Sequence, residues 1–249
     1  MLLLPLAMAL VAFVYASVGH AGATGYIAVL VLAGWTPALI KPAALVLNAL
    51  VAGLGCWNFL RAGHFPARRF AALYLLAVPM AFAGGWLQLP GGWFERLVGV
   101  VLWGSAWRLG RACEDPPALR PASVPALLAV GGSLGLLAGL TGTGGGVFLT
   151  PWLLMARWCG TRQAAAISVL FILLNSLAGL AGLLRARPMA LAPLLSQPLL
   201  PWIVAAVLLA GALGSRLGSR HWPVAWIRRA LALVLGLAGA KLLGLPPLR

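Results

Sequence analysis

The sequence predicts an all-α polytopic membrane protein built from two inverted repeats, and three observations lead to this fold class. First, 62% of the 249 residues are hydrophobic and only 8% are charged, whereas a soluble domain has about 25% charged residues. Second, the 18 Lys and Arg residues lie almost entirely between apolar runs, where positive charge orients membrane helices. Third, the order of long and short apolar runs occurs twice.

The first half is expected to contain a broken helix pair followed by three membrane helices. An apolar run over residues 1–18 is interrupted at residues 19–25, which include Gly19, His20 and Thr24. The next apolar piece, 26–34, covers about 13 Å as a helix, less than half of a ~30 Å hydrocarbon core. The three membrane helices are expected at residues 42–60, 70–89 and 97–109.

The second half follows the same order after a polar, proline-rich linker at residues 111–122. We therefore assign residues 1–110 to the first transmembrane repeat and 123–249 to the second. An apolar run at 124–140 is broken at 141–146 and followed by a short piece at 147–156. Membrane helices are expected at 163–184, 199–213 and 230–245.

The two halves also match in single positions. Gly19 and Gly142 are 123 residues apart, as are Gly22 and Gly145, and Arg61 and Arg185 are 124 apart. An internal repeat of this kind is characteristic of transporters. Single glycine matches are weak because glycine is common here, so the shared order of elements is the stronger indication.

The placement of positive charge distinguishes two topologies. If each broken pair is a hairpin, one face carries Lys41, Arg96, Arg185, Arg187, Lys241 and Arg249, and the other 12 of the 18 positive residues lie opposite. If each pair crosses once, the split is 10 against 8. The positive-inside rule favours the hairpin model, with inverted repeats, both termini outside and the linker inside.

The break at residues 141–146, Thr-Gly-Thr-Gly-Gly-Gly, has two interpretations. It is either a helix-packing device or a site for a small anion. Glycine disfavours a helix interior by about 1 kcal/mol, and a helix that restarts after the break presents free N–H groups that attract an anion. The predicted substrate-binding residues at this break are Thr141, Gly142, Thr143, Gly144, Gly145 and Gly146.

The first break and the long helices contribute the remaining candidates. His20 is an ionisable residue inside the membrane, which makes it a candidate for substrate binding or proton coupling; a structural histidine is the equal alternative. Asn48 and Asn175 could donate hydrogen bonds to substrate or join helices, of which joining helices is favoured, and Ser168 and Ser176 are weaker candidates of the same kind. Lys41 is interpreted as a residue that snorkels to the interface. The first-break candidates are Gly19, His20, Gly22, Thr24 and Gly25.

Four stretches of the second half carry a resemblance to a known family. They are Gly-Thr-Gly-Gly-Gly at 142–146, Pro151, Ala-Ala-Ala-Ile-Ser at 164–168 and Asn-Ser-Leu-Ala-Gly at 175–179. The chain resembles the sulfite exporter TauE/SafE family over nearly its whole length. This resemblance implies export of sulfite, sulfonates or related organosulfur anions through repeated halves with broken first helices.

The sequence therefore predicts a secondary transporter of a small sulfur-containing or carboxylate anion that works by alternating access in the cell inner (plasma) membrane. The alternative is a non-transporting scaffold or an accessory subunit of a sulfur-metabolising enzyme. An enzyme is not expected, because three carboxylates and three scattered histidines offer no catalytic pair or metal cluster. The expected partners are the anionic substrate and the lipid bilayer, with no nucleic acid and no cofactor; a homodimer is left open.

Overall fold

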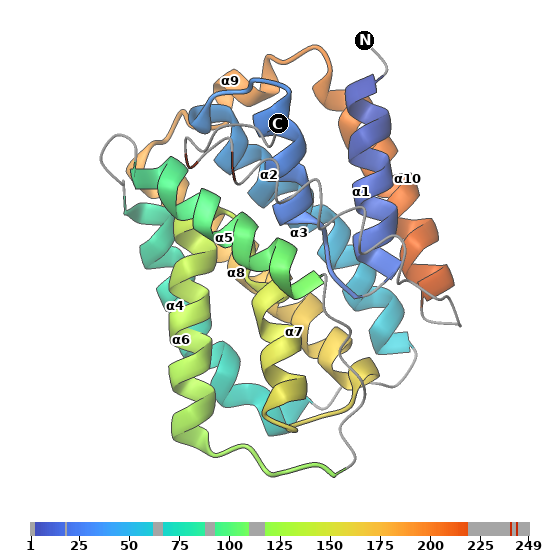
Figure 1. Ribbon diagram of the computed structural model, residues 1–249. Coiled ribbons are helices and arrows are strands. Elements are labelled where there is room, and N and C mark those ends of the chain that lie inside the picture. The colour runs from blue at the N-terminus through green and yellow to red at the C-terminus, as the bar shows by residue number, and fades with distance from the viewer. Residues whose placement is uncertain are drawn as a thin grey trace.

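The computed structural model describes residues 3–17, 19–61, 67–87, 93–109 and 118–218, together with residues 240 and 243. All regular structure in this part of the chain is helical (Figure 1). The helices are α1 Leu3–Ser17, α2 Ala23–Leu32, α3 Pro37–Arg61, the 3-10 turn η1 Ala67–Phe70, α4 Ala71–Trp86, α5 Trp93–Leu109, α6 Val124–Thr141, α7 Gly146–Met155, α8 Thr161–Ala186, α9 Ala192–Leu195 and α10 Leu200–Gly218.

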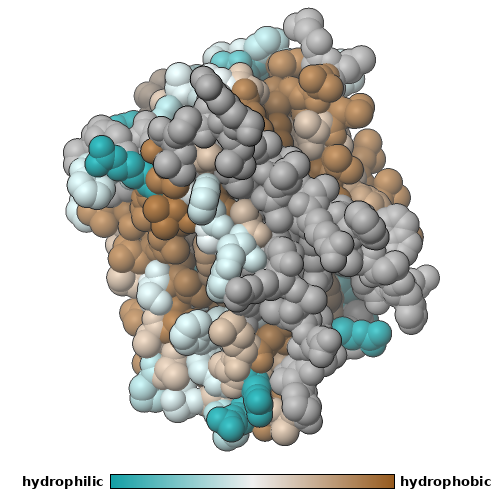
Figure 2. Space-filling model, viewed as in Figure 1, coloured by the Kyte–Doolittle hydropathy of each residue, from teal (hydrophilic) through white to brown (hydrophobic). Residues whose placement is uncertain are grey.

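The surface of the helices is that of a membrane protein. Among the described residues, 4 helices are long and apolar enough to cross a bilayer, namely α3, α6, α8 and α10. Large apolar side chains such as Leu6 of α1 and Leu209 of α10 are exposed, and Figure 2 shows hydrophobic residues in brown over this side of the molecule. Every arginine whose side chain is described is exposed. The prediction of an all-α, multi-pass membrane protein is confirmed.

The observed helices differ from the predicted ones mainly at their ends. The third helix starts at Pro37 rather than at Pro42, so Pro42 lies inside it. Proline removes one backbone hydrogen bond from a helix interior, and the packing of this helix in the core outweighs that loss. The short elements η1 and α9 were not predicted. The helix expected at 230–245, the basic loop after Gly218 and residues 111–117 of the linker lie outside the described residues, apart from 240 and 243.

The broken pair α6–α7 forms a hairpin. The N–H of Arg120, just before α6, donates to the carbonyl of Arg157, just after α7, at 2.7 Å. The pair therefore enters and leaves at the same end, and Figure 1 shows the start of α6 and the end of α7 both at the bottom of the view. In the first pair, α2 packs back on α1, because Gly25 lies against Val11 and the hydroxyls of Tyr15 and Thr24 share a hydrogen bond of 2.9 Å.

The two halves pack reciprocally. Helix α6, the first of its half, lies along α4, and α1 lies along α10. Helices α3 and α8 cross in opposite directions, since Gly55 faces Val169 while Leu45 faces Gly179. If the halves are inverted repeats, α1 corresponds to α6 and α4 to α10. The α1–α10 pairing is then the equivalent of the α6–α4 pairing. The inverted relation of the halves to a bilayer stays a prediction.

A close helix contact uses three glycines of α6. Gly131, Gly135 and Gly139 lie directly against the backbone of α4, at Leu73, Ala77 and Ala81 respectively. Small residues at this spacing let helix backbones approach within a membrane, where van der Waals packing replaces the hydrophobic effect. This close packing fixes where α6 ends relative to α4.

Cysteine labelling tests which residues share a membrane face. In a variant without Cys56, Cys113 and Cys159, we expect Arg120→Cys and Arg157→Cys to be protected from an impermeant maleimide added outside intact cells. Arg187→Cys should react, because the 26-residue helix α8 carries the chain about 39 Å to the other end. Labelling of positions 120 and 157 from opposite faces would contradict the hairpin.

Candidate functional site

Both breaks are built from glycines in the left-handed conformation. Gly142 ends α6 at φ 77°, and Gly145 caps the start of α7 at φ 77°. Gly22 caps α2 at φ 105°, and Gly19 precedes it at φ 77°. Residues with a Cβ rarely adopt this conformation. The glycines therefore reverse the chain within the apolar core without a longer loop.

The start of α7 presents backbone N–H groups that have no protein acceptor. Among the described residues, the amides of Gly144, Gly145, Gly146 and Val147 donate to no carbonyl or side chain. Four free N–H groups are normal at a helix N-terminus, but here the whole turn is buried. A buried N–H group without an acceptor costs about 1–3 kcal/mol, so a bound anion would stabilise this turn.

The two threonines of the break brace the loop. The hydroxyl of Thr141 donates to the carbonyl of Leu137 at 2.7 Å, and its oxygen lies 2.9 Å from that of Thr143 and 3.3 Å from the Thr143 amide nitrogen. Since the Thr141 proton is used inside α6, this hydroxyl can serve a ligand only as an acceptor. The donors that this break offers are therefore its backbone amides.

Three buried polar side chains lie at the crossing of α3 and α8 next to this break. The side-chain nitrogen and oxygen of Asn48 and Asn175 and the hydroxyl of Ser176 are fully buried and have no partner in the described structure. A Cβ at Gly144 would lie 2.9 Å from Asn48 Nδ2 and 3.3 Å from Ser176 Oγ. We call Asn48, Ser176 and Gly144, together with the buried Asn175 next to Ser176 in α8, the midpoint cluster. Its side chains offer donors and acceptors that no described residue uses.

His20 joins the first break to the second half. Its Nε2 lies 3.1 Å from the carbonyl oxygen of Gly146 and 3.1 Å from Thr150 Oγ1, and Thr150 Oγ1 is 2.7 Å from Ser168 Oγ. A carbonyl oxygen only accepts, so the contact with Gly146 is a hydrogen bond in the tautomer that carries the proton on Nε2, whereas in the other tautomer Nε2 accepts from the hydroxyl of Thr150. The chain His20–Thr150–Ser168 therefore runs from one break into the interior of the opposite half.

The other residues of the first break pack within or between helices. Gly22 lies under the Tyr26 ring, Gly25 lies against Val11, and Thr24 is tied to Tyr15. Gly19 touches Ala165 of α8. The structure thus brings His20, Asn48, Ser168, Gly144 and Gly146 to one region, and it places Gly22, Thr24 and Gly25 against their own half.

The expectation that Lys41 snorkels to the interface is wrong, because its side chain is only 8% exposed. The position of Lys41 near the start of α3 suggested an end residue, but α4 and α6 cover it. Thr150 was not recognised as a site residue. A signal was present, since it is a polar residue one helical turn after Gly146 in an apolar run, and it therefore shares the face that Gly146 presents.

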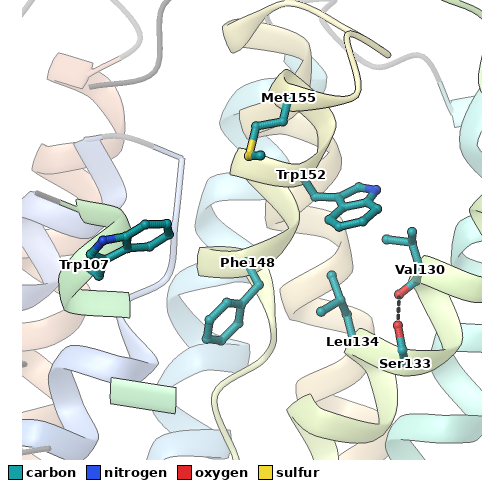
Figure 3. A pocket seen from close by; sticks show the side chains of 7 residues that line it. All are labelled: Trp107, Val130, Ser133, Leu134, Phe148, Trp152 and Met155. Carbon is teal, nitrogen blue, oxygen red and sulfur yellow. Dashed lines mark hydrogen bonds between the residues drawn. The ribbon is translucent and has the colours of Figure 1, made fainter. Parts of the chain in front are cut away.

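A separate cavity of about 340 Å³ lies against the outer face of α7 (Figure 3). Trp107 of α5, Leu134 of α6 and Trp152 of α7 are among its lining residues. Its polar side chain, Ser133, donates to the Val130 carbonyl of the same helix at 3.2 Å. Its lining is otherwise apolar and aromatic, and it includes no residue of the midpoint cluster, so the two are distinct.

A multi-pass helical protein with two buried helix breaks and unpaired polar groups at their junction has the architecture of a membrane transporter. The comparisons agree with this class. The chain belongs to the sulfite exporter TauE/SafE family, whose model matches residues 4–242. It is 37% identical over 246 residues to the "Probable membrane transporter protein y4hK" of Sinorhizobium fredii (strain NBRC 101917 / NGR234), and this match covers 96% of the chain and 97% of the relative. No solved structure matches the chain.

The coupling between Thr150 and Ser168 can be measured with a double-mutant cycle. We expect Thr150→Val and Ser168→Ala to couple by about 0.5–1.5 kcal/mol in the free energy of unfolding, because they share one buried hydrogen bond. Unfolding by sodium dodecyl sulfate in mixed micelles gives this energy. The matched control pairs Thr150→Val with Ser133→Ala, whose hydroxyl bonds its own helix, and should show no coupling. Equal coupling in both cycles would contradict the His20–Thr150–Ser168 chain.

Proposed function

We propose that the protein is a secondary transporter that exports a small sulfur-containing anion, such as sulfite, a sulfonate or a related organosulfur or carboxylate anion, across the inner plasma membrane. The midpoint cluster is the observation that carries this proposal. Its side chains are buried without partners, and a protein retains such groups at a cost unless a ligand binds them. Family membership supports the class of substrate.

The chemistry of the cluster suits an oxyanion. The free amides of Gly144 to Val147 and the side-chain amide of Asn48 are donors, and the positive end of the α7 dipole points at the same place. A sulfite or sulfonate group presents three oxygens as acceptors. Neutral donors stabilise such a group without holding it as tightly as an arginine clamp would, which allows release on the other side.

The position of the cluster suits alternating access. It lies where α3 of one half crosses α8 of the other, so a rocking motion of the halves would open it first to one face and then to the other. The sequence has no nucleotide-binding loop, because Val147 stands where such a loop requires lysine. The driving force would come from the gradient of the substrate or of protons, with His20 as the candidate proton carrier.

The rival function is a scaffold or an accessory subunit beside a sulfur-metabolising enzyme. A scaffold has no need for buried amides without partners at the junction of its halves. Thermal unfolding of the purified protein with sulfite, thiosulfate or sulfoacetate separates the two functions, because a transporter binds at least one of these anions and is stabilised by it. A scaffold would unfold at the same temperature with and without them.

Transport in proteoliposomes tests the site directly. We expect Asn48→Ala and Asn175→Ala each to lower the rate of sulfite efflux at least tenfold, because each removes a donor that faces the substrate. Asn58→Ala is the matched control: Asn58 lies on α3 as well but donates to Ser215 of α10 at 2.8 Å, away from the break. Wild-type efflux in the Asn48 and Asn175 variants, with all three proteins equally well inserted, would refute this site.

A further inference from the structure

Lys41 is a buried cation for which the described side chains provide no countercharge. Its side chain is 8% exposed, and no ion pair involves it in the described structure. The chain has 3 Asp and Glu residues, namely Glu95, Glu114 and Asp115, and the described side chains include none of them. Burial of an unpaired charge is unfavourable. Among the described side chains no carboxylate neutralises Lys41, so a bound anion would stabilise its charged form.

A purely structural role accounts for only part of this arrangement. Lys41 Nζ donates to the carbonyl of Gly84, in the last turn of α4, at 3.4 Å. A cation is favourable at a helix C-terminus, so Lys41 caps α4. One long hydrogen bond nevertheless uses only one of three ammonium protons, and it leaves the charge itself unneutralised.

The same face of α3 leads from Lys41 to the midpoint cluster. Lys41, Leu45 and Asn48 are spaced four and three residues apart, so they lie on one side of the helix. A Cβ at Gly142 would lie 3.4 Å from Lys41 Cγ and 3.7 Å from Leu45 Cγ, while Gly144 faces Asn48. The break at residues 142–144 therefore runs along this face of α3, from the Lys41 ammonium at one end to the side-chain amide of Asn48 at the other.

We propose that Lys41 supplies the countercharge for the transported anion. The anion binds along the break between the Lys41 ammonium and the amides of Asn48 and Gly144, and this inference rests on the proposed function of the same site. Neutral donors alone would accept polar uncharged molecules as well as anions. Lys41 accounts for selection of a full negative charge, and the weak bond to Gly84 leaves the ammonium able to turn toward the substrate.

The test compares sulfite binding and efflux in Lys41→Met, Lys41→Gln and Lys41→Arg, with Arg61→Gln as the control for loss of a charge. Arg61 ends the same helix, is exposed and stacks on Trp57 at 4.4 Å. We expect Lys41→Met and Lys41→Gln to raise the half-saturating sulfite concentration at least tenfold, measured by the sulfite-induced shift in unfolding temperature. Without sulfite, their unfolding temperature should equal or exceed that of the wild type, because a buried unpaired charge is gone. Lys41→Arg and Arg61→Gln should stay within threefold of wild-type half-saturation.

The inference is overturned if Lys41→Gln has the half-saturating sulfite concentration of the wild type and also unfolds at a lower temperature without sulfite. Lys41 would then serve only as a cap for α4. If Lys41→Met does not fold, Lys41→Gln carries the test, because its amide keeps a polar donor at this position without the charge. Absence of both sulfite binding and efflux in the wild type would refute the proposed function and this inference with it. A wild type that binds and exports sulfite, beside a Lys41→Gln variant that does so equally well, would refute only the inference.

Discussion

The whole arrangement depends on one constraint: a peptide chain in an apolar environment must satisfy its backbone polar groups internally. The two breaks are the places where this protein departs from that constraint. Part of the cost is recovered locally, since the Gly142 amide donates to Ala138 and Thr141 donates to Leu137. The amides at the start of α7 are left over, and they lie beside Asn48 and Ser176, which also lack partners. The amides of Ala23, Thr24 and Gly25 at the start of α2 also have no acceptor among the described residues, but the second break combines its free amides with side chains that lack partners.

The sequence predicts most of this fold, because hydropathy and glycine placement act locally. The apolar runs become helices, and residues 19–25 and 141–146 interrupt their helices as expected. The sequence does not predict contacts between distant helices. The burial of Lys41 depends on α4 and α6 covering it, and the bond from His20 to Gly146 joins residues 126 positions apart. Neither follows from a periodic pattern.

The two breaks play different parts, although the sequence places them at equivalent positions. The second break exposes its amides to the midpoint cluster. In the first, Thr24 bonds Tyr15 and Gly22 is covered by Tyr26, so these residues hold their own half together. His20 is the exception, because it reaches across to Gly146 and Thr150. We expect the second half to bind the substrate and the first half to supply, through His20, a contact that motion between the halves must make and break.

A structure with a bound, anomalously scattering anion tests the central claim most directly. Selenate is suitable, because its oxygens resemble those of a sulfonate and its selenium can be located without ambiguity. We expect one selenium position inside the protein, with the selenate oxygens within hydrogen-bonding reach of the Gly144–Gly146 amides and of Asn48. This position lies beside the face of α3 that runs from Lys41 to Asn48. Selenium found only in the cavity beside Trp152, or only at exposed arginines, would contradict the account.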